Sequence, residues 1–186
     1  MNAPGKAIEA GTTDDAFDFE IFFHVHYERI ARVIVRVVRD PARAEEIAVE
    51  VFWKFWRDPR LARSDRAGGW LHRTAVRMAL DELRKQARRL RHESRPATPR
   101  PSQTPEEAHA AAEERDRIRL VLASLDKRQA ELLLLRSNDL SYGEVAAALG
   151  LNPSSVGTLI SRAQAAFRKE YVKQYGEPQY ERGTLG

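Results

Sequence analysis

The 186-residue sequence contains no cysteine, which excludes both disulfide bonds and thiolate metal sites. It also lacks a long hydrophobic run, since no segment approaches the roughly 18 consecutive apolar residues of a membrane span. The first twenty residues, MNAPGKAIEAGTTDDAFDFE, are polar and acidic, unlike a secretory signal. These absences predict a cytoplasmic protein with no membrane partner.

Features typical of enzymes and metal proteins are equally scarce. There is no glycine-rich phosphate-binding loop, and the five histidines are scattered along the chain. Only His24 and Glu28 have the i, i+4 spacing of metal ligands on a helix, and a surface contact between them is the simpler interpretation. We therefore expect no enzyme activity, no metal and no cofactor.

What the sequence does contain is helical periodicity, with almost no signal for β-strands. Apolar residues recur every three or four positions over residues 17–38, over 42–57 and from 69 past 88, as on one face of an α-helix. The dipeptides Asp40-Pro41 and Asp58-Pro59 end the first two segments, because a residue before proline disfavours the α conformation.

The composition changes abruptly after the third segment. The stretch ESRPATPRPSQTPEE carries four prolines and no aliphatic residue larger than alanine, which is typical of a flexible linker. The sequence thus predicts an all-α protein with two small helical domains, residues 17–92 and 108–173, joined by a proline-rich linker at 93–107. We expect residues 1–16 to be a disordered N-terminus and 174–186 to be a tail.

The second domain contains the pattern of a helix-turn-helix. Ser141 and Glu144 have the spacing of a capping box, which starts a short helix, and Gly150 lies where a helix ends in a left-handed turn. Asn152 can cap the next helix, with Pro153 at its first position. A short helix, a tight glycine turn and a second helix with a polar outer face are typical of DNA binding. A helical hairpin inside a bundle is the alternative.

Polar residues at the starts of these two helices are the candidate DNA contacts. The second helix would place its first turns in a major groove, where short polar side chains reach base edges or phosphates. An arginine further along suits a phosphate. The candidate set is Ser141, Tyr142, Ser154, Ser155, Thr158, Ser161 and Arg162.

The third helix of the first domain carries a narrow line of positive charge. On a helical wheel its arginines fall within about 60° of one another, and Trp70 lies at the edge of the line. The arginines are Arg73, Arg77, Arg84, Arg88 and Arg91, and Asp81 is the one acid among them. Such a line follows a phosphate backbone, and the indole can stack on an unpaired base. A merely solvated helix face is the alternative.

The second helix has apolar residues on two sides. One continuous apolar face is assigned to the core; it comprises Ala44, Ile47, Ala48, Val51, Phe52, Phe55 and Trp56. Trp53 lies about 160° from the centre of that face, with Val49 four residues earlier and glutamates around it. An exposed tryptophan in such a setting is typical of a protein-contact hot spot. Burial of the helix on both sides is an equally acceptable alternative.

Three motifs in this order resemble bacterial RNA polymerase sigma factors of the extracytoplasmic-function group of the sigma-70 family. They are RAEEIAVEVFWKFWR, WLHRTAVRMALDELRKQARR and LDKRQAELLLLRSNDLSYGEVAAALGLNPSSVGTLISRA, and the resemblance covers residues 17–171. It implies that the first domain docks on the β′ clamp helices of core polymerase and opens the −10 element. It also implies that the second domain reads the −35 element and touches the β flap. An anti-sigma factor would be a further partner.

The resemblance assigns individual residues to these partners. The segment that binds core polymerase corresponds to Glu46, Val49, Glu50, Phe52 and Trp53. The helix that melts and captures the −10 strand corresponds to Trp70, Arg73, Arg77, Asp81, Arg84, Lys85 and Arg88. The −35 element falls to the helix-turn-helix residues given above.

This sequence departs from the family pattern within these segments. Val49 stands where glutamine is common, and Val76-Arg77 stands where an arginine-asparagine pair is common. In the second helix of the helix-turn-helix, Gly157 and Leu159 replace a lysine and an arginine. Two positive contacts with the −35 element are therefore missing, although Leu159 fits the apolar face of its helix.

The competing function is a helix-turn-helix activator or repressor that is not a polymerase subunit. Its first domain would be a sensor or a dimeriser. Such a protein needs neither a line of arginines beside a tryptophan nor an exposed Trp53. These two features of the first domain favour a sigma factor.

Overall fold

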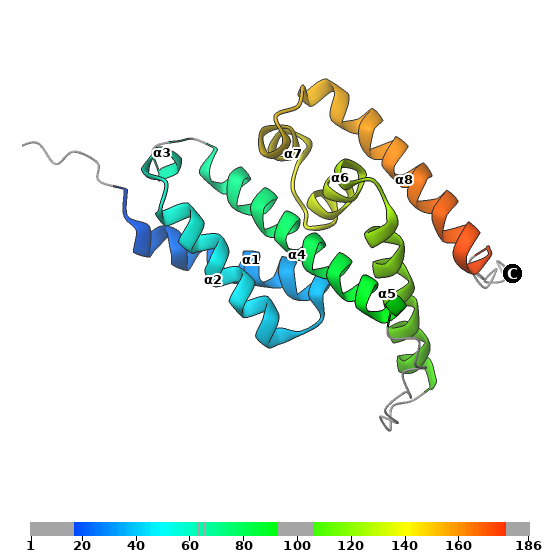
Figure 1. The fold of residues 1–186 in the computed structure, drawn as a ribbon. Coiled ribbons are helices and arrows are strands. Elements are labelled where there is room, and N and C mark those ends of the chain that lie inside the picture. Colours follow the sequence, from blue (N-terminus) through cyan, green and yellow to red (C-terminus); the bar gives the residue numbers. More distant parts are fainter. Residues whose placement is uncertain (1–16, 63, 65, 93–105, 178–186) are drawn as a thin grey trace, which may run out of the picture.

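The computed structural model describes residues 17–62, 64, 66–92 and 106–177, and every regular element in these ranges is an α-helix (Figure 1). The predicted N-terminal segment and most of the predicted linker and tail lie outside the described residues. Within the described part of the chain, no helix has the length and apolar character needed to cross a membrane.

The first domain consists of α1 (Phe19–Val38), α2 (Pro41–Trp56), α3 (Pro59–Ala62) and α4 (Ala67–His92). The break between α1 and α2 lies at the predicted Asp40-Pro41 dipeptide. The Asp40 carboxylate caps α2 by accepting a hydrogen bond of 3.1 Å from the backbone N–H of Arg43. Pro41 takes the first helical position, where a missing N–H costs nothing. Local sequence therefore explains where α2 begins.

The core of the first domain lies between α1, α2 and α4. Its largest fully buried side chains come from all three helices and are Ile30, Ile34, Ile47, Phe55, Leu71 and Leu80. Phe22 of α1 stacks on Phe55 of α2 with 4.7 Å between the ring centroids. Each such burial stabilises the fold by about 1.5–3 kcal/mol, so the apolar faces of the three helices hold them together.

Trp56 is not a core residue, and its assignment to the apolar face was wrong. Its side chain is 58 % exposed and stacks on Trp53 with 5.3 Å between the ring centroids. In an α-helix, Trp56 lies about 100° around the axis from Phe55 but only about 60° from Trp53. It therefore belongs to the exposed side of α2.

The second domain consists of α5 (Glu106–Ser124), α6 (Lys127–Ser137), α7 (Tyr142–Leu149) and α8 (Pro153–Tyr175). Helix α5 starts inside the stretch predicted as linker, and α8 continues into the predicted tail. The helices enclose a core in which the largest fully buried apolar side chains are Leu132, Leu135 and Leu140. Leu132 and Leu135 belong to the segment ELLLL of α6, and Leu140 lies in the turn that follows this helix.

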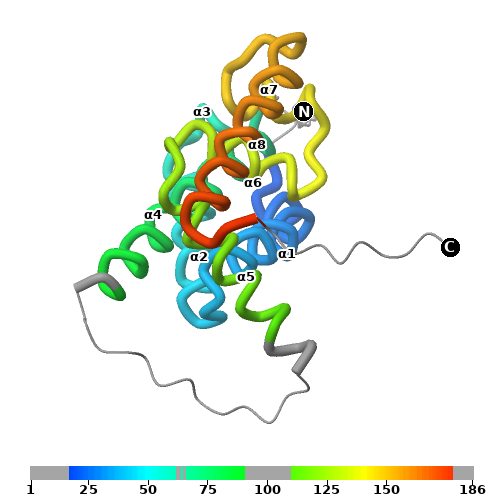
Figure 2. The backbone as a smooth tube through the Cα atoms, turned by 90° about the vertical axis from the view of Figure 1, so that its right-hand side faces the viewer, coloured from blue at the N-terminus to red at the C-terminus, as the bar shows by residue number. Residues whose placement is uncertain are grey.

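Helix α4 lies between the two domains. Helices α1 and α2 pack on one side of it, and α5, α6 and α7 pack on the other (Figure 1). Figure 2, a side view, shows α7 and the first turns of α8 at the end of the molecule opposite α2. The buried apolar residues of both domains join in one cluster. The domains are thus packed together, an arrangement beyond the tethered pair that the sequence predicted.

Candidate nucleic-acid interface

The helix-turn-helix has the predicted local structure. The Ser141 hydroxyl accepts a hydrogen bond of 3.2 Å from the Glu144 N–H, and the Glu144 carboxylate accepts one of 2.7 Å from the Ser141 N–H. Gly150 ends α7 in the left-handed conformation, with φ 63°. Asn152 then caps α8 by accepting a hydrogen bond of 3.1 Å from the Ser154 N–H. These contacts confirm the capping box, the turn and the start of the second helix.

The outer face of this motif is open. All seven candidate contacts with the −35 element are exposed: Ser141, Tyr142, Ser154, Ser155, Thr158, Ser161 and Arg162. On the opposite side of α8, Val156, Ile160 and Ala163 are buried in the domain core. Helix α8 is therefore held by its apolar side and presents its polar side to solvent, as a groove-reading helix must.

Gly157, which stands where the family commonly has a lysine, lies beside the ring of Tyr142. A Cβ atom at Gly157 would lie 3.4 Å from Cε2 of Tyr142, so the tyrosine ring packs beside the glycine. The guanidinium of Arg136 lies over the same ring, 5.6 Å from its centroid, in cation–π geometry. Arg136 thus brings a positive charge next to the candidate face. Arg136 was not among the candidates predicted from the sequence, because it belongs to α6 and lies outside the helix-turn-helix.

Leu159, which replaces an arginine of the family pattern, is partly buried and packs against the hydrophobic core. The substitution therefore serves packing of α8 on its own domain.

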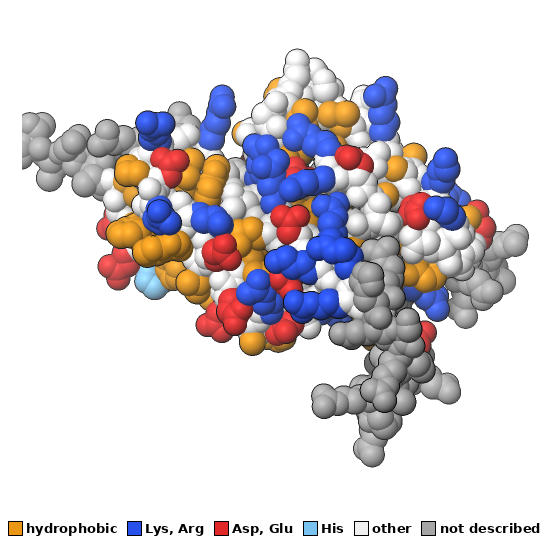
Figure 3. All heavy atoms as spheres, viewed as in Figure 1, with side chains coloured by type: hydrophobic (Ala, Val, Ile, Leu, Met, Phe, Trp, Pro, Cys, Tyr) orange, Lys and Arg blue, Asp and Glu red, His pale blue; other side chains and the backbone are white. Residues whose placement is uncertain are grey.

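The positively charged line of α4 divides into two groups. Lys85 and Arg88 are exposed, whereas Arg73, Arg77 and Arg84 are half-buried against the second domain. The side chain of Arg91 lies outside the part of the chain that the structure describes. Figure 3 shows Lys and Arg side chains gathered over the middle of the molecule, where α4 lies between the domains.

Two of the half-buried arginines, Arg77 and Arg84, form hydrogen bonds with the second domain. The Nε of Arg77 donates to the Glu131 carboxylate of α6 at 2.8 Å. Arg84 donates from Nε to the carbonyl oxygen of Ala123 at 3.2 Å and from Nη2 to that of Leu125 at 3.1 Å. Both side chains are only partly exposed, and each has a defined partner in the second domain, which a merely solvated charged face would not have.

The remaining candidates on α4 differ in their surroundings. Trp70 is half-buried, with its ring centroid 5.9 Å from that of Phe55. Burial and the neighbouring Arg77 lower the pKa of Arg73, whose Nε is buried without a hydrogen bond to another described residue. Asp81 is exposed and lies 3.9 Å from Lys127 of α6. Arg73, which also interacts electrostatically with Glu131 and Arg128 of α6, and Asp81 thus lie near the boundary between the domains, whereas Trp70 packs on the core of the first domain.

Helix α2 presents an apolar surface outside the core. Val49 and Trp53 are 55 % and 54 % exposed, and Trp53 stacks on the exposed Trp56. We call these three residues, Val49, Trp53 and Trp56, the tryptophan patch. Of the two alternatives for Trp53, burial on both sides of α2 is thus excluded within the described structure.

The other candidates on α2 have different roles. Glu46 and Glu50 are exposed, and each pairs with a basic residue of its own helix, Arg43 at 2.6 Å and Lys54 at 3.1 Å. Phe52, in contrast, is 2 % exposed and packs on Phe23 of α1. Its assignment as a polymerase contact is corrected: the side chain belongs to the core, because it points from α2 toward α1.

Two family models match the chain in the order of its domains. The model of sigma-70 region 2 matches residues 22–89, which include most of α1 and α4. The model of sigma-70 region 4 matches residues 115–166, from α5 into α8. The packed core around α2 and α4 and the helix-turn-helix therefore each coincide with a separate sigma-70 region.

Several proteins named as RNA polymerase sigma factors are similar to most of the chain. The chain is 31% identical over 166 residues to the ECF RNA polymerase sigma factor SigK of Mycolicibacterium vanbaalenii, covering 83% of this chain and 82% of the relative. It is 26% identical over 180 residues to the ECF RNA polymerase sigma factor SigE of Mycolicibacterium smegmatis, with coverages of 93% and 70%. A probable RNA polymerase sigma factor, RfaY of Xanthomonas campestris pv. campestris, is 31% identical over 163 residues, with coverages of 78% and 38%.

Proposed function

The chain belongs to the extracytoplasmic-function group of the sigma-70 family, and from that premise we propose how its surfaces divide the work of starting transcription. As a sigma factor it binds core RNA polymerase and promoter DNA and directs transcription initiation. The proposal concerns which residues carry each of these contacts.

The −35 element is read by α8 of the second domain. Its seven exposed candidates lie on one side of the helix-turn-helix, where hydroxyl groups reach base edges and Arg162 reaches a phosphate. Arg136, held over the Tyr142 ring, adds a positive charge that the substitution at Gly157 had removed. The domain also touches the β flap of the polymerase.

The −10 element is melted and held by α4. Arg73, Arg77, Arg84, Lys85 and Arg88 supply positive charge along one line of the helix, and arginine forks suit phosphate oxygens. Trp70 lies at the start of this line, where an indole can stack on a base taken out of the duplex. The sequence of the bound strand is set by these residues together.

Core polymerase is bound by the tryptophan patch of α2, with Glu46 and Glu50 at its edge. The target is the β′ clamp helices, and the same surface is available to an anti-sigma factor. Tryptophan is enriched among residues that dominate binding energies at protein interfaces. Because its partners are the polymerase and the chromosome, the protein acts in the cytoplasm.

The observation that carries this proposal is the exposure of Trp53 and Trp56 on a domain separate from the helix-turn-helix. A regulator that works without being a polymerase subunit does not need this second surface. The test is binding of the purified protein to a library of promoter fragments, with and without core polymerase, followed by run-off transcription. We expect weak binding alone, strong binding with core polymerase, and transcripts from the selected fragments. Tight, specific binding without polymerase and no transcript with it would support the independent regulator instead.

A further inference from the structure

The second domain occupies the side of α4 that the −10 strand needs. Arg77 pairs with Glu131, whose side chain is only 2 % exposed although it carries a carboxylate. A buried carboxylate needs a cation or hydrogen-bond donors to offset its lost hydration. In this structure a residue proposed to bind DNA supplies both, through Nε at 2.8 Å and Nη2 at 3.5 Å.

Arg84 lies about two helical turns further along α4 and is also held by the second domain. It donates to the carbonyl oxygens of Ala123 and Leu125, which lie at the C-terminal end of α5. The last carbonyl groups of a helix carry partial negative charge. Glu131 and the end of α5 therefore offer the two arginines the same kind of partner that phosphate oxygens would offer.

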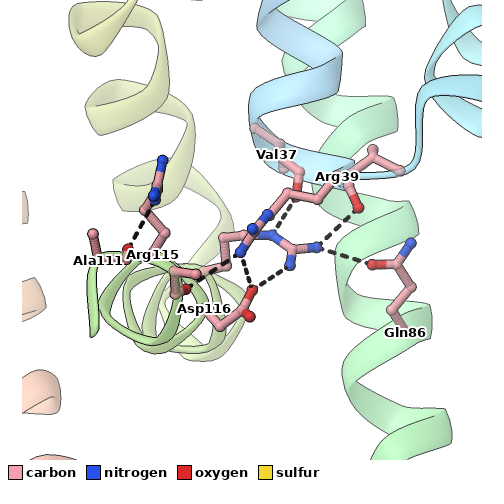
Figure 4. Close-up of polar contacts among 9 residues, drawn as sticks. Val37, Arg39, Gln86, Ala111, Arg115 and Asp116 are labelled. Carbon is pink, nitrogen blue, oxygen red and sulfur yellow. Dashed lines mark hydrogen bonds and ion pairs between the residues drawn. The ribbon is translucent and has the colours of Figure 1, made fainter. Parts of the chain in front are cut away.

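A second set of polar contacts ties α5 to the first domain (Figure 4). Arg119 donates to the carbonyl oxygens of Val37 at 2.6 Å and Val38 at 3.0 Å, and to the side chain of Gln86 at 3.1 Å. Asp116 accepts a hydrogen bond of 2.7 Å from Arg39 at the end of α1. The second domain is therefore fastened to α1 as well as to α4.

The domains also pack closely at the N-terminal end of α4. A Cβ atom at Gly69 would be 3.3 Å from the backbone of Ala148 and 3.6 Å from its Cβ. A Cβ atom at this position would require α7 to shift by only a few tenths of an ångström. Trp70, the proposed stacking residue, follows directly in the chain, so α7 lies close to the place where an unpaired base would be held.

We propose that the free protein is self-inhibited, with the second domain covering the DNA-binding side of α4, and that this domain must leave α4 before the −10 strand can bind. The inference rests on the proposed function of α4. Arg77 cannot hold both Glu131 and a phosphate, and α6 fills the space that a strand along Arg73, Arg77 and Arg84 would take. The apparent affinity for the strand is then reduced by the fraction of molecules that are open.

Two features make this closed state suitable for opening. It leaves the Nδ1 of His72 and the Nε of Arg73 buried without a hydrogen bond to another described residue, and such groups oppose burial. The tryptophan patch, in contrast, remains exposed in the closed state. Core polymerase can therefore dock on α2 first, and the second domain can swing away from α4 afterwards.

A reversible cross-link tests the need for opening. The chain has no cysteine of its own, and the 3.6 Å between Cβ positions at Gly69 and Ala148 falls within the roughly 3.5–4.5 Å of disulfides. The full-length double variant Gly69→Cys/Ala148→Cys is oxidised, and its run-off transcription with core polymerase is compared before and after reduction. We expect the disulfide to form readily and to reduce the transcript at least about tenfold, with recovery on reduction. The single variant Gly69→Cys, treated identically, should not respond.

A disulfide that fails to form, or an oxidised protein as active as the reduced one, overturns the proposal. Wild-type protein run in parallel distinguishes failure of this proposal from failure of the proposed function. If wild type gives no transcript on any promoter fragment, the sigma-factor assignments fail, whatever the cross-link does.

An opening variant tests the same proposal without a cross-link. Glu131→Gln keeps the size of the side chain and removes the charge that holds Arg77. Glu114→Gln makes the same charge change on α5, where the Glu114 carboxylate accepts hydrogen bonds from the Tyr171 hydroxyl of α8. Binding to a fluorescent single-stranded DNA of randomised sequence is measured by anisotropy, and thermal melting checks folding. If about a tenth of wild-type molecules are open, Glu131→Gln binds up to about tenfold more tightly than Glu114→Gln. Equal affinities of two folded variants would show that the second domain does not restrict α4.

Discussion

Trp53 and Trp56 stack on each other on the exposed side of α2, with 5.3 Å between their ring centroids and 28° between the ring planes. Because the two indole side chains already stack on each other, they lose little conformational freedom when a partner protein binds them. The pair therefore links the packing of the first domain to its proposed contact with the polymerase.

Replacing Trp53 with alanine should weaken binding to core polymerase by about 2 kcal/mol, as removal of a hot-spot aromatic does. The free energy of unfolding should change by no more than about 0.5 kcal/mol, because the side chain is exposed. Binding is measured by titration with core polymerase and stability by urea denaturation. Trp56→Ala should also leave stability nearly unchanged.

The control for this prediction is Phe55→Ala, which removes a side chain buried between α1 and α2 and should cost about 3–5 kcal/mol of stability. The Trp53→Ala variant could instead lose as much stability as Phe55→Ala while its folded fraction still binds polymerase normally. That result would contradict the assignment of the tryptophan patch as a polymerase contact.

The exposed basic residues of α4 can be separated from those at the domain boundary. We expect Lys85→Ala/Arg88→Ala to melt promoter DNA less efficiently and with a weaker dependence on salt, because two phosphate contacts are lost. Stability should change by less than about 0.5 kcal/mol per site. Open-complex formation is followed by permanganate reactivity of unpaired thymines at several salt concentrations. Unchanged opening would mean that Lys85 and Arg88 are only part of a solvated surface.

Gly157→Lys should restore a positive contact with the −35 duplex. A Cβ at this position meets the Tyr142 ring at 3.4 Å, an ordinary contact distance, and lysine favours a helix over glycine by somewhat less than about 1 kcal/mol. We expect tighter binding of a promoter duplex by the polymerase holoenzyme and a salt dependence steeper by about 0.9 in log–log slope. Gly157→Gln, which adds length without charge, should leave the slope unchanged. A lysine variant with the slope of the glutamine variant would place Gly157 away from the DNA.

The stability of the protein should fall between pH 6.5 and pH 4 because of His72. Burial, the nearby Arg29 and then His26 lower its pKa to about 4, against a smaller opposing effect of Glu144. The unfolded chain binds a proton at this site near pH 6.5 while the folded protein does not, so acid favours the unfolded state. The contribution is complete above pH 6.5 and decreases by about 3 kcal/mol as the pH falls to 4.

Urea denaturation of wild type and His72→Gln at several pH values measures this effect, and the variant should lose most of the slope between pH 6.5 and pH 4. Glu144, whose pKa is lowered chiefly by its hydrogen bond from the Ser141 N–H, acts only below about pH 4.5, so the two residues act in largely separate windows. Parallel pH profiles for wild type and variant would show that His72 is solvated in the folded protein.

The helix-turn-helix could be predicted from local sequence, together with the polar outer face of its second helix. Ser141, Glu144, Gly150 and Asn152 act on backbone groups within a few residues of themselves, so their effect depends little on the rest of the fold. The three motifs also identify the family, because they record residue types in order along the chain. Helical periodicity placed Trp53 on the outer side of α2 but left its exposure open. It assigned Trp56 to the core, because a count of apolar residues ignores that Trp56 lies at the edge of the apolar face.

The surroundings of the arginines of α4, in contrast, follow from the packing of the two domains and could not be predicted from local sequence. Arg77 meets Glu131 at a sequence separation of 54 residues, and Gly69 meets Ala148 from the other domain. No local preference connects such residues; they come together only when two apolar surfaces exclude water and bring α6 and α7 onto α4. The charge of each arginine can be taken from the sequence. Whether that charge meets solvent, DNA or a carboxylate of the same chain depends on how the two domains pack.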